Sequence, residues 1–323
     1  MNDRFRILSE TDVESLIDLE SMLPVVENAL IAQEADAVVR PERPHYPIGA
    51  GLDGPDALGM GLTMPAYIEG SPYVVTKLAT VHEDNPARGL PTVNATVAVG
   101  DARTGQPLAY MAGNGVTNVR TGCIGGVTAA TFTDGEIDLG VIGAGTQARW
   151  QTRAIDAATA VGSVRIFSPS DSKHACAAEL NDHGIDASAV ETPAAALSGS
   201  DVVVTATTSN EPVFAGDDLE AGTLVIAVGA FDERMQELDR RTIERADALY
   251  ADVPAEAIET GDIPDDHADR VQSLGTALEH PPSRNDGSIV VVKSVGSAVL
   301  DAAAAGELFE TAERNDVGAI VQL

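Results

Sequence analysis

One segment of the sequence, IDLGVIGAGTQARW, constrains the fold more than any other. An apolar run over residues 137–142 leads directly into a glycine-rich turn, and a helical pattern follows. Gly143 permits a tight turn, Gly145 lets the backbone approach a pyrophosphate, and the small Ala148 allows the helix to pack on the strand. The pattern predicts a dinucleotide site at a helix N-terminus, although glycine-rich turns also have purely structural roles. The turn residues predicted to bind the cofactor are Gly143, Ala144, Gly145, Thr146 and Gln147.

The chain after residue 120 repeats the pattern of this segment. Short apolar runs without polar alternation are separated by Ala-rich helical stretches, which is typical of strands buried on both faces of a parallel sheet. The fold class predicted is therefore α/β, with a Rossmann-type doubly wound parallel sheet. The predicted strands are 137–142, 164–167, 202–205, 224–228 and 289–292.

The end of the second predicted strand bears on the choice between NAD and NADP. NAD enzymes often carry an acid there for the ribose hydroxyls, but this chain has Ser168 and Ser170, and Asp171 comes late. These serines and Lys173 would suit a 2′-phosphate, or they would form an ordinary turn and helix cap. We expect NAD or NADP as cofactor, with a slight preference for NADP.

The remaining chain is assigned more coarsely. The first forty residues are expected to be helical, with Thr11 and Glu14 at capping-box spacing. Loops and short strands are expected over 40–72, strands over 73–78 and 92–99, a turn at DARTGQ (101–106), and a last helix over 297–314. The run 252–269 holds seven acids and no Lys or Arg, and is expected to be a solvated helix and loop.

Composition limits the partners. The chain has 323 residues, about two domains' worth, and 20 Lys and Arg against 50 Asp and Glu, for a net charge of −30. Such a surface repels phosphate backbones and anionic lipids, so nucleic acid and membrane are excluded as partners. Only three of the cations are lysines, and the acids are scattered along the chain. We interpret this as the charge shell of a halophile's protein; an ordinary acidic bacterial enzyme is the alternative.

The sequence also predicts a cytoplasmic location. Cys123 and Cys176 form no CxxC pair or metal-ligand spacing, which favours a reducing compartment. The first ten residues, MNDRFRILSE, have no apolar core of a secretory signal, and no apolar run is long enough to span a membrane.

Several segments together resemble one family, the ornithine cyclodeaminase/mu-crystallin family. It includes cyclodeaminases, archaeal alanine dehydrogenases and ketimine reductases. The matching segments follow the family's order and cover most of the chain after residue 40. They are MPAYIEG, VVTKLA, NPARGLPTV, DARTGQPLAYM, VRTG, VIGAGTQA, TATTSNEPV, VGAFDERMQELD and VKSVGSAVLDAAAA.

The resemblance implies two domains and a homodimer. Residues 1–119 and 297–323 would form an α+β substrate-binding and dimerisation domain, with the dinucleotide domain, 120–296, inserted in it. Arg43, Lys77 and Arg120 would line the pocket of a small imino or amino acid. The further cofactor-binding residues implied are Thr121, Thr207, Gly229 and Lys293. For Lys293, in KSVG, a structural role at the domain junction is an equal alternative.

Physical chemistry supports these cations independently. A substrate carboxylate suits the two-pronged geometry of Arg, although Arg43 and Arg120 would also form surface ion pairs among fifty acids. Lys77 lies inside an apolar strand of a chain that has nearly abandoned lysine. Burial would lower its pKa towards the range useful for proton transfer, so Lys77 is the predicted catalytic residue.

Two departures from the family decide between activities. Phe231 stands where cyclodeaminases and archaeal alanine dehydrogenases carry a catalytic Asp, and Leu62 stands where cyclodeaminases carry a Glu. We therefore expect an NAD(P)-dependent oxidoreductase acting at the C–N bond of a small imino or amino acid. The alternatives are an ornithine cyclodeaminase-type lyase with internally recycled NAD, and a non-catalytic dinucleotide-binding protein.

No metal site is predicted. His82, Glu83 and Asp84 look like a ligand cluster, but they precede Asn85-Pro86 in a turn-rich segment and are better explained as a solvated loop.

Overall fold

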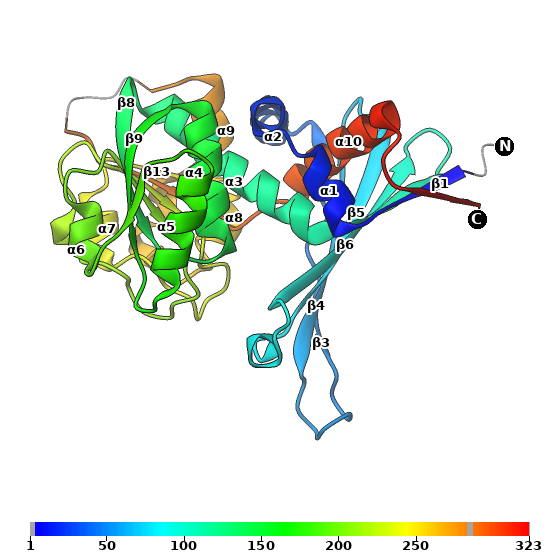
Figure 1. Ribbon diagram of the computed structural model, residues 1–323, viewed down its shortest axis with the longest axis horizontal. Helices are drawn as coiled ribbons and strands as arrows, with labels where there is room; N and C mark the ends of the chain where they lie inside the picture. The colour runs from blue at the N-terminus through cyan, green and yellow to red at the C-terminus, as the bar shows by residue number, and fades with distance from the viewer. Residues whose placement is uncertain (1–3, 283–286, 323) are drawn as a thin grey trace. The chain divides into compact units, whose positions relative to one another are not determined.

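The computed structural model describes residues 4–282 and 287–322, which form two compact units (Figure 1). The first unit comprises Met1–Asp18, Ala35–Arg120 and Ala298–Leu323, and the second comprises Leu19–Glu34 and Thr121–Ser297. The helix over Leu19–Glu34 thus groups with the second unit, whereas the sequence analysis assigned it to the N-terminal domain. The roles predicted for the two domains stay predictions.

The first unit is built on an eight-stranded mixed sheet in the order β16-β1-β7-β6-β5-β4-β2, with β3 paired to β4. Among the described strands of this sheet, only β1 and β7 pair in parallel. Its strands are β1 (Arg4–Leu8), β2 (Val38–Val39), β3 (His45–Ile48), β4 (Gly59–Ile68), β5 (Tyr73–Val81), β6 (Val93–Asp101), β7 (Pro107–Ala112) and β16 (Ala319–Gln322). Its helices are α1 (Glu10–Leu16), the 3-10 turn η1 (Asn85–Arg88) and α10 (Ala298–Asn315), while α3 (Gly113–Phe132) continues from it into the second unit.

Strand alternation gives this sheet two unlike faces. On β5, Val75, Lys77 and Ala79 are buried, whereas Val74 and Leu78 are exposed. The buried face is covered by α10, which packs on β4, β5 and β6. Because side chains point alternately to the two faces of a strand, Lys77 faces α10.

The N-terminal segment differs from its prediction. Residues Arg4–Leu8 form β1 instead of a helix, because they pair with β16 and β7 and bury Phe5 and Leu8. The capping box also begins two residues earlier than predicted: the Asp12 amide donates to the Ser9 hydroxyl (3.2 Å), and the Ser9 amide donates to the Asp12 carboxylate (2.9 Å). The predicted turn at DARTGQ is confirmed, with Asp101 accepting hydrogen bonds from the Arg103 and Thr104 amides (both 2.8 Å).

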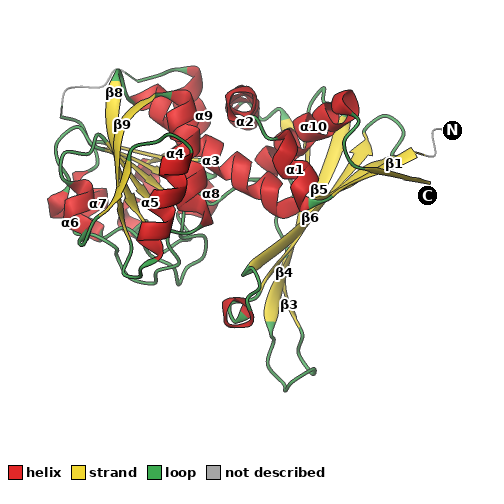
Figure 2. Ribbon diagram, in the orientation of Figure 1, coloured by secondary structure: helices red, strands yellow, loops and turns green. Residues whose placement is uncertain are grey.

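The second unit confirms the predicted parallel sheet. Its eight strands follow the order β10-β9-β8-β11-β12-β15-β13-β14, and Figure 2 shows them between helices, with α4 and α5 on the near side. The strands are β8 (Glu136–Ile142), β9 (Ala160–Phe167), β10 (Ala187–Ala189), β11 (Val202–Thr205), β12 (Leu224–Ala227), β13 (Ala248–Ala251), β14 (Val271–Ser273) and β15 (Val290–Lys293). The helices are α2 (Leu19–Glu34), α4 (Thr146–Ala158), α5 (Ser172–Asp182), α6 (Pro193–Leu197), α7 (Arg240–Arg245), α8 (Pro254–Ala257), α9 (Leu274–Glu279), and the 3-10 turns η2 (Gly216–Asp218) and η3 (Asp265–Arg270).

The strand order places the glycine-rich turn at the switch point of the sheet. The chain moves outward from β8 through β9 to β10 and then returns to β11 on the other side of β8. Ligands of open α/β sheets bind beside the carboxyl ends of the strands at such a point. The sequence analysis missed β10, β13 and β14, which have only three or four residues each.

Within the described residues, no helix is long and apolar enough to cross a membrane.

Candidate functional site

The glycine-rich turn has the geometry that its sequence predicts. Gly143 has φ +113°, and a Cβ there would lie 2.4 Å from the Ala206 carbonyl oxygen, so only glycine fits. Gly145 is the N-cap of α4, and a Cβ there would meet no atom within 4 Å. The space beside Gly145 is therefore open, at a helix N-terminus that favours negative charge, which fits a dinucleotide pyrophosphate.

The other turn residues support this shape. Ala144 is buried under the turn, Thr146 is exposed, and Gln147 is half-buried in the first turn of α4. Arg149 donates from Nη1 to the carbonyl oxygens of Ala144 (2.6 Å) and Gly145 (3.1 Å). Arg149 thus anchors two carbonyls of the turn, while the Gly143 amide donates to the Phe167 carbonyl (2.8 Å).

Three hydroxyls gather where β9 ends. Ser170 Oγ lies 2.6 Å from Ser172 Oγ, and Ser168 Oγ lies 3.3 Å from Ser170 Oγ. Lys173, named beside these serines in the sequence analysis, is buried and pairs with Glu191 (2.9 Å) and the Val190 carbonyl (3.1 Å). The Lys173 ammonium is thus bound by residues that follow β10, and the polar groups at the end of β9 are the serine hydroxyls.

A buried carboxylate, Glu237, joins the ends of β11 and β12. It accepts hydrogen bonds from the Thr205 hydroxyl (2.9 Å) and from the amides of Thr207 and Gly229 (both 2.7 Å). A Cβ at Gly229 would lie 2.2 Å from the Thr207 carbonyl oxygen, so glycine is needed for this approach. Burial raises the pKa of Glu237, and the positive charge of Lys293 opposes that rise. Glu237 therefore fixes two of the predicted cofactor residues, Thr207 and Gly229.

Lys293 is fully buried at the end of β15. Its Nζ lies 2.8 Å from Asp262 Oδ2, and Asp262 Oδ1 accepts hydrogen bonds from the amides of Glu237 (2.6 Å) and Leu238 (2.8 Å). The structure gives this lysine a protein partner, and its predicted contact with the cofactor stays a prediction. Thr121 is buried in α3, and its carbonyl oxygen accepts a hydrogen bond from Gln151 Nε2 (2.6 Å).

The first unit holds a second buried charge cluster. Lys77 Nζ lies 2.6 Å from Asp301 Oδ2, and Arg120 Nε donates to Asp301 Oδ1 at 2.9 Å. Lys77 Nζ also donates to the Thr117 hydroxyl (3.4 Å), which itself donates to the Gly113 carbonyl (2.8 Å). The structure thus brings together two of the three predicted substrate residues, from β5 and α3, around a carboxylate of α10.

The electrostatics of this cluster follow from its burial. Burial lowers the pKa of Lys77 to about 8; Asp301 opposes this shift, while the positive charges of Arg120 and Arg43 add to it. Burial alone would raise the pKa of the Asp301 carboxyl, but Lys77 and Arg120 hold it below its usual range. Arg43 lies half-buried in the segment between β2 and β3 and acts on Lys77 through its charge.

The sequence analysis missed three buried acids that hold the predicted residues: Asp301, Glu237 and Asp262. The expectation that the run 252–269 is solvated was wrong at Asp252 and Asp262, which are both buried. Asp252 accepts hydrogen bonds from the Ser294 hydroxyl and the Val295 and Gly296 amides (2.7–3.0 Å). A signal was available for Asp301, since an acid among the apolar residues of SAVLDAAAAG lies on a helix with little polar surface.

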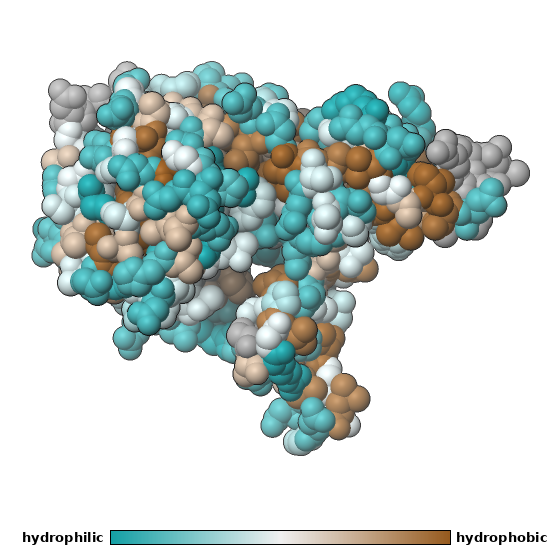
Figure 3. All heavy atoms as spheres, in the orientation of Figure 1, coloured by the Kyte–Doolittle hydropathy of each residue, from teal (hydrophilic) through white to brown (hydrophobic). Residues whose placement is uncertain are grey.

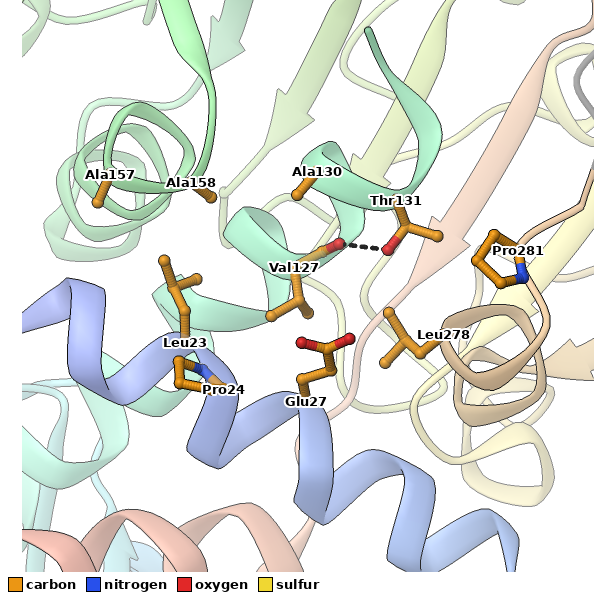
Figure 4. A pocket seen from close by; sticks show the side chains of 10 residues that line it. All are labelled: Leu23, Pro24, Glu27, Val127, Ala130, Thr131, Ala157, Ala158, Leu278 and Pro281. Atoms are coloured by element: carbon orange, nitrogen blue, oxygen red, sulfur yellow. Dashed lines mark hydrogen bonds between the residues drawn. The ribbon is translucent and has the colours of Figure 1, made fainter.

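Other candidate features lie apart from these clusters. His82 contacts the Leu58 carbonyl (3.0 Å), Glu83 and Asp84 are exposed, and the described residues hold no group of His, Cys, Asp or Glu that would bind a metal. Figure 4 shows a separate hollow of the second unit, of about 540 Å³, which contains no predicted site residue. It is lined by Leu23, Pro24, Glu27, Val127, Ala130, Thr131, Ala157, Ala158, Leu278 and Pro281.

Together, the doubly wound sheet and the glycine-rich turn at its switch point have the features of a dinucleotide-binding fold, and the first unit holds a buried cluster of two cations and one carboxylate. Residues 4–316 match the model of the ornithine cyclodeaminase/mu-crystallin family, and the chain belongs to this family.

Its relatives include enzymes of known activity. The chain is 31% identical to a Delta(1)-pyrroline-2-carboxylate reductase of Bacillus cereus, over 97% of this chain and 98% of that protein. It is similar to the solved structure of the Thermococcus litoralis Delta(1)-pyrroline-2-carboxylate reductase in complex with NADH and L-proline (TM-score 0.91, 29% identity, 98% of this chain and 100% of that chain). It is also similar to an archaeal alanine dehydrogenase dimer with bound NAD (TM-score 0.89, 28% identity, 99% of each chain).

Proposed function

We propose that this protein is an NAD(P)-dependent oxidoreductase that acts at the C–N bond of a small imino or amino acid, as a ketimine reductase or amino-acid dehydrogenase. The observation that carries the proposal is the buried cluster of Lys77, Arg120 and Asp301. Two cations share one carboxylate there, so the cluster has an excess positive charge that calls for an anionic ligand. A substrate carboxylate supplies that charge.

Arg120 is the residue proposed to bind this carboxylate. Its Nε is engaged by Asp301, which leaves the two terminal nitrogens of the guanidinium for a two-pronged contact with the substrate. Arg43 contributes a further positive charge that is felt at Lys77. Both arginines thus draw an α-carboxylate towards the lysine.

Lys77 is the proposed proton donor. With a pKa of about 8, its ammonium is charged at neutral pH and releases a proton more readily than an exposed lysine. When bound, the nicotinamide supplies or accepts a hydride at the substrate α-carbon. In the direction of reduction, Lys77 then gives a proton to the substrate nitrogen and recovers it from solvent. The residues proposed to hold the dinucleotide are those of the turn, Gly143 to Gln147, with Thr121, Thr207 and Gly229.

The absence of two carboxylates favours reduction over cyclodeamination. Leu62 pairs with Ala79 on β5, so it lies on the same face of the sheet as Lys77, two positions away. Phe231 is exposed in the loop after Gly229, and the neighbouring Asp232 pairs with Arg234 (3.1 Å). Neither position offers a carboxylate for the amines of ornithine.

The test is a substrate screen at molar KCl that follows cofactor absorbance. Cyclic ketimino acids, pyruvate with ammonia, and ornithine are each offered with NADH and NADPH, or with their oxidised forms for ornithine. We expect oxidation of reduced cofactor with a cyclic ketimino acid or with pyruvate and ammonia. Release of ammonia from ornithine without net change of cofactor would instead identify a lyase, and no turnover with any substrate would identify a binding protein.

We further propose a preference for NADP, on the three serines at the end of β9. Hydroxyls there suit a 2′-phosphate, and Asp171 comes late in the sequence for the acid that binds ribose hydroxyls in NAD enzymes. Ser170→Asp is expected to reverse the preference towards NADH, measured as the ratio of kcat/KM for the two cofactors. A wild type that prefers NADH would contradict the proposal.

The exposed face of the first unit's sheet is the proposed dimer interface. Ile7, Val74, Leu78 and Tyr110 are each 39–47% exposed on strands β1, β5 and β7. Figure 3 shows hydrophobic residues on the surface of this unit. We expect sedimentation to show a dimer, and the double variant Val74→Asp/Leu78→Asp to be a monomer.

The acidic composition leads us to propose a halophilic, cytoplasmic protein. A net charge of −30 repels itself unless salt screens it, with a Debye length of about 3 Å at 1 M. The melting temperature should therefore rise steeply between low salt and molar KCl. A melting temperature that is unchanged over this range would contradict the halophilic interpretation and leave the enzymatic one untouched.

A further inference from the structure

The carboxylate of Asp301 is the common partner of Lys77 and Arg120. It is fully buried on α10, and each of its oxygens contacts one cation. Oδ2 lies 2.6 Å from Lys77 Nζ, and Oδ1 accepts a hydrogen bond from Arg120 Nε (2.9 Å). The Lys77 ammonium also donates to the Thr117 hydroxyl (3.4 Å), so that Asp301 and Thr117 both hold it.

We propose that Asp301 is the positioning residue of this site, which fixes the Lys77 ammonium and the Arg120 guanidinium for a carboxylate-bearing substrate without touching that substrate. The inference rests on the proposed function. Its physical basis is that burial disfavours the charged form of a lysine, and a nearby negative charge favours it again. Because Asp301 also takes the Nε edge of Arg120, it decides which edge of the guanidinium meets the substrate.

The charged groups around Lys77 make the proposal testable by pH. Asp301 faces it from α10, Arg120 from α3, and Arg43 from the segment before β3. Its partners across the sheet, Met64 on β4 and Val97 on β6, carry no charge. Asp301 is therefore the negative group that acts most strongly on Lys77, and its removal leaves the positive charges of Arg120 and Arg43.

The chain offers a direct measurement, because it has only three lysines: Lys77, Lys173 and Lys293. Protein labelled with ¹³C at the lysine ε-carbons gives three signals, and the Lys77→Met variant identifies the one from Lys77. In the wild type that signal should titrate near pH 8. In Asp301→Asn it should titrate about 1–3 pH units lower, as expected when a close opposite charge is lost. The signals of Lys173 and Lys293 are internal references that should not move.

The same shift should be seen in catalysis. Reduction needs the protonated lysine, so kcat/KM falls as pH rises through the pKa of Lys77, and this alkaline limb should move with the titration in Asp301→Asn. A shift of one pH unit makes the defect about tenfold larger on the alkaline side than on the acidic side. Asp301→Glu keeps the charge and should keep the limb near its original position. If Asp301→Asn does not fold, Asp301→Glu serves as the test variant. An alkaline limb of kcat/KM that moves by about one pH unit or more in Asp301→Glu would then contradict the proposal.

Asp252→Asn is the matched control, since Asp252 is as buried as Asp301 but contacts only backbone amides and a serine hydroxyl. It should leave the Lys77 titration in place. The inference is overturned if Lys77 titrates at the same pH in wild type and Asp301→Asn, or if that variant loses the same fraction of rate at every pH. Because the titration needs no turnover, failure of the proposed function, seen as no activity in the substrate screen, is distinguished from failure of this inference.

Discussion

The two units each bury a lysine against an aspartate, and the two pairs differ in what surrounds them. In the first unit, Lys77 and Arg120 share Asp301, so positive charge is in excess. In the second, Lys293 pairs with Asp262 beside Glu237, so negative groups are in excess. Both lysines lie at similar distances from their partners, 2.6 and 2.8 Å.

The difference shows why the same ion pair can serve chemistry in one place and architecture in the other. The carboxylates of Glu237 and Asp262 accept hydrogen bonds from four backbone amides, so their negative charge is satisfied by the backbone. Asp301 accepts only from side-chain cations in the structure described here. We infer that the second cluster holds the strand ends in place, while the first has a charge left for a ligand.

The largest expected effect is the loss of dinucleotide binding on substitution of Gly145, which should leave the charge cluster of the first unit unchanged. Gly145→Val places a branched side chain in the open space beside the turn, which no protein atom occupies within 4 Å. The fold should be retained by circular dichroism, while dinucleotide binding measured by calorimetry should be lost. The ¹³C titration of Lys77 in the other unit should not change. Normal cofactor binding by this variant would mean that the phosphates bind elsewhere.

A second variant tests the architectural role of the other lysine. Lys293→Met removes one partner of a fully buried pair and leaves Asp262 and Glu237 without a counter-charge. Loss of one partner from such a pair costs about 3–5 kcal/mol of unfolding free energy, measured by urea denaturation at fixed molar KCl. Lys77→Met should cost less, because Arg120 still pairs with Asp301. Equal losses in the two variants would break the comparison.

A smaller effect follows from the lowered pKa of Lys77. The folded protein releases the lysine proton near pH 8, whereas the unfolded chain holds it up to its ordinary value of 10.5. Between these values the unfolded state binds more protons, so the free energy of unfolding gains a contribution that rises with pH. The wild type should thus become more stable relative to Lys77→Met from pH 8 to pH 10. Parallel stability curves for the two proteins would contradict a lowered pKa.

Much of the fold could be predicted because its signals are local. The turn at Gly143 joins an apolar strand to a helix within one short segment, and the buried runs of the parallel sheet need no partner to be recognised. The strand Arg4–Leu8 could not be found in this way, since its pairing with β16 brings together residues more than three hundred positions apart.

The sequence predicted the cationic residues of the site but not its buried carboxylates. Lys77 stood out because the chain has so few lysines, whereas Asp301, Asp262 and Glu237 are three among fifty acids. Their burial depends on which helix or strand end covers them, and composition cannot show this. The acidic run 252–269 illustrates the point, because Asp262 is buried against Lys293 while Asp265 and Asp266 in the same run are exposed.

The most direct test of the account is kcat of Lys77→Met on the best substrate found in the screen, at saturating cofactor and neutral pH. If the lysine protonates the substrate nitrogen, the variant should bind the dinucleotide normally and lose about 10²–10⁴-fold in kcat. Lys77→Arg should not restore the rate, because a guanidinium keeps its proton at this pH. A kcat of Lys77→Met within threefold of the wild type would reduce Lys77 to a structural residue and contradict the mechanism.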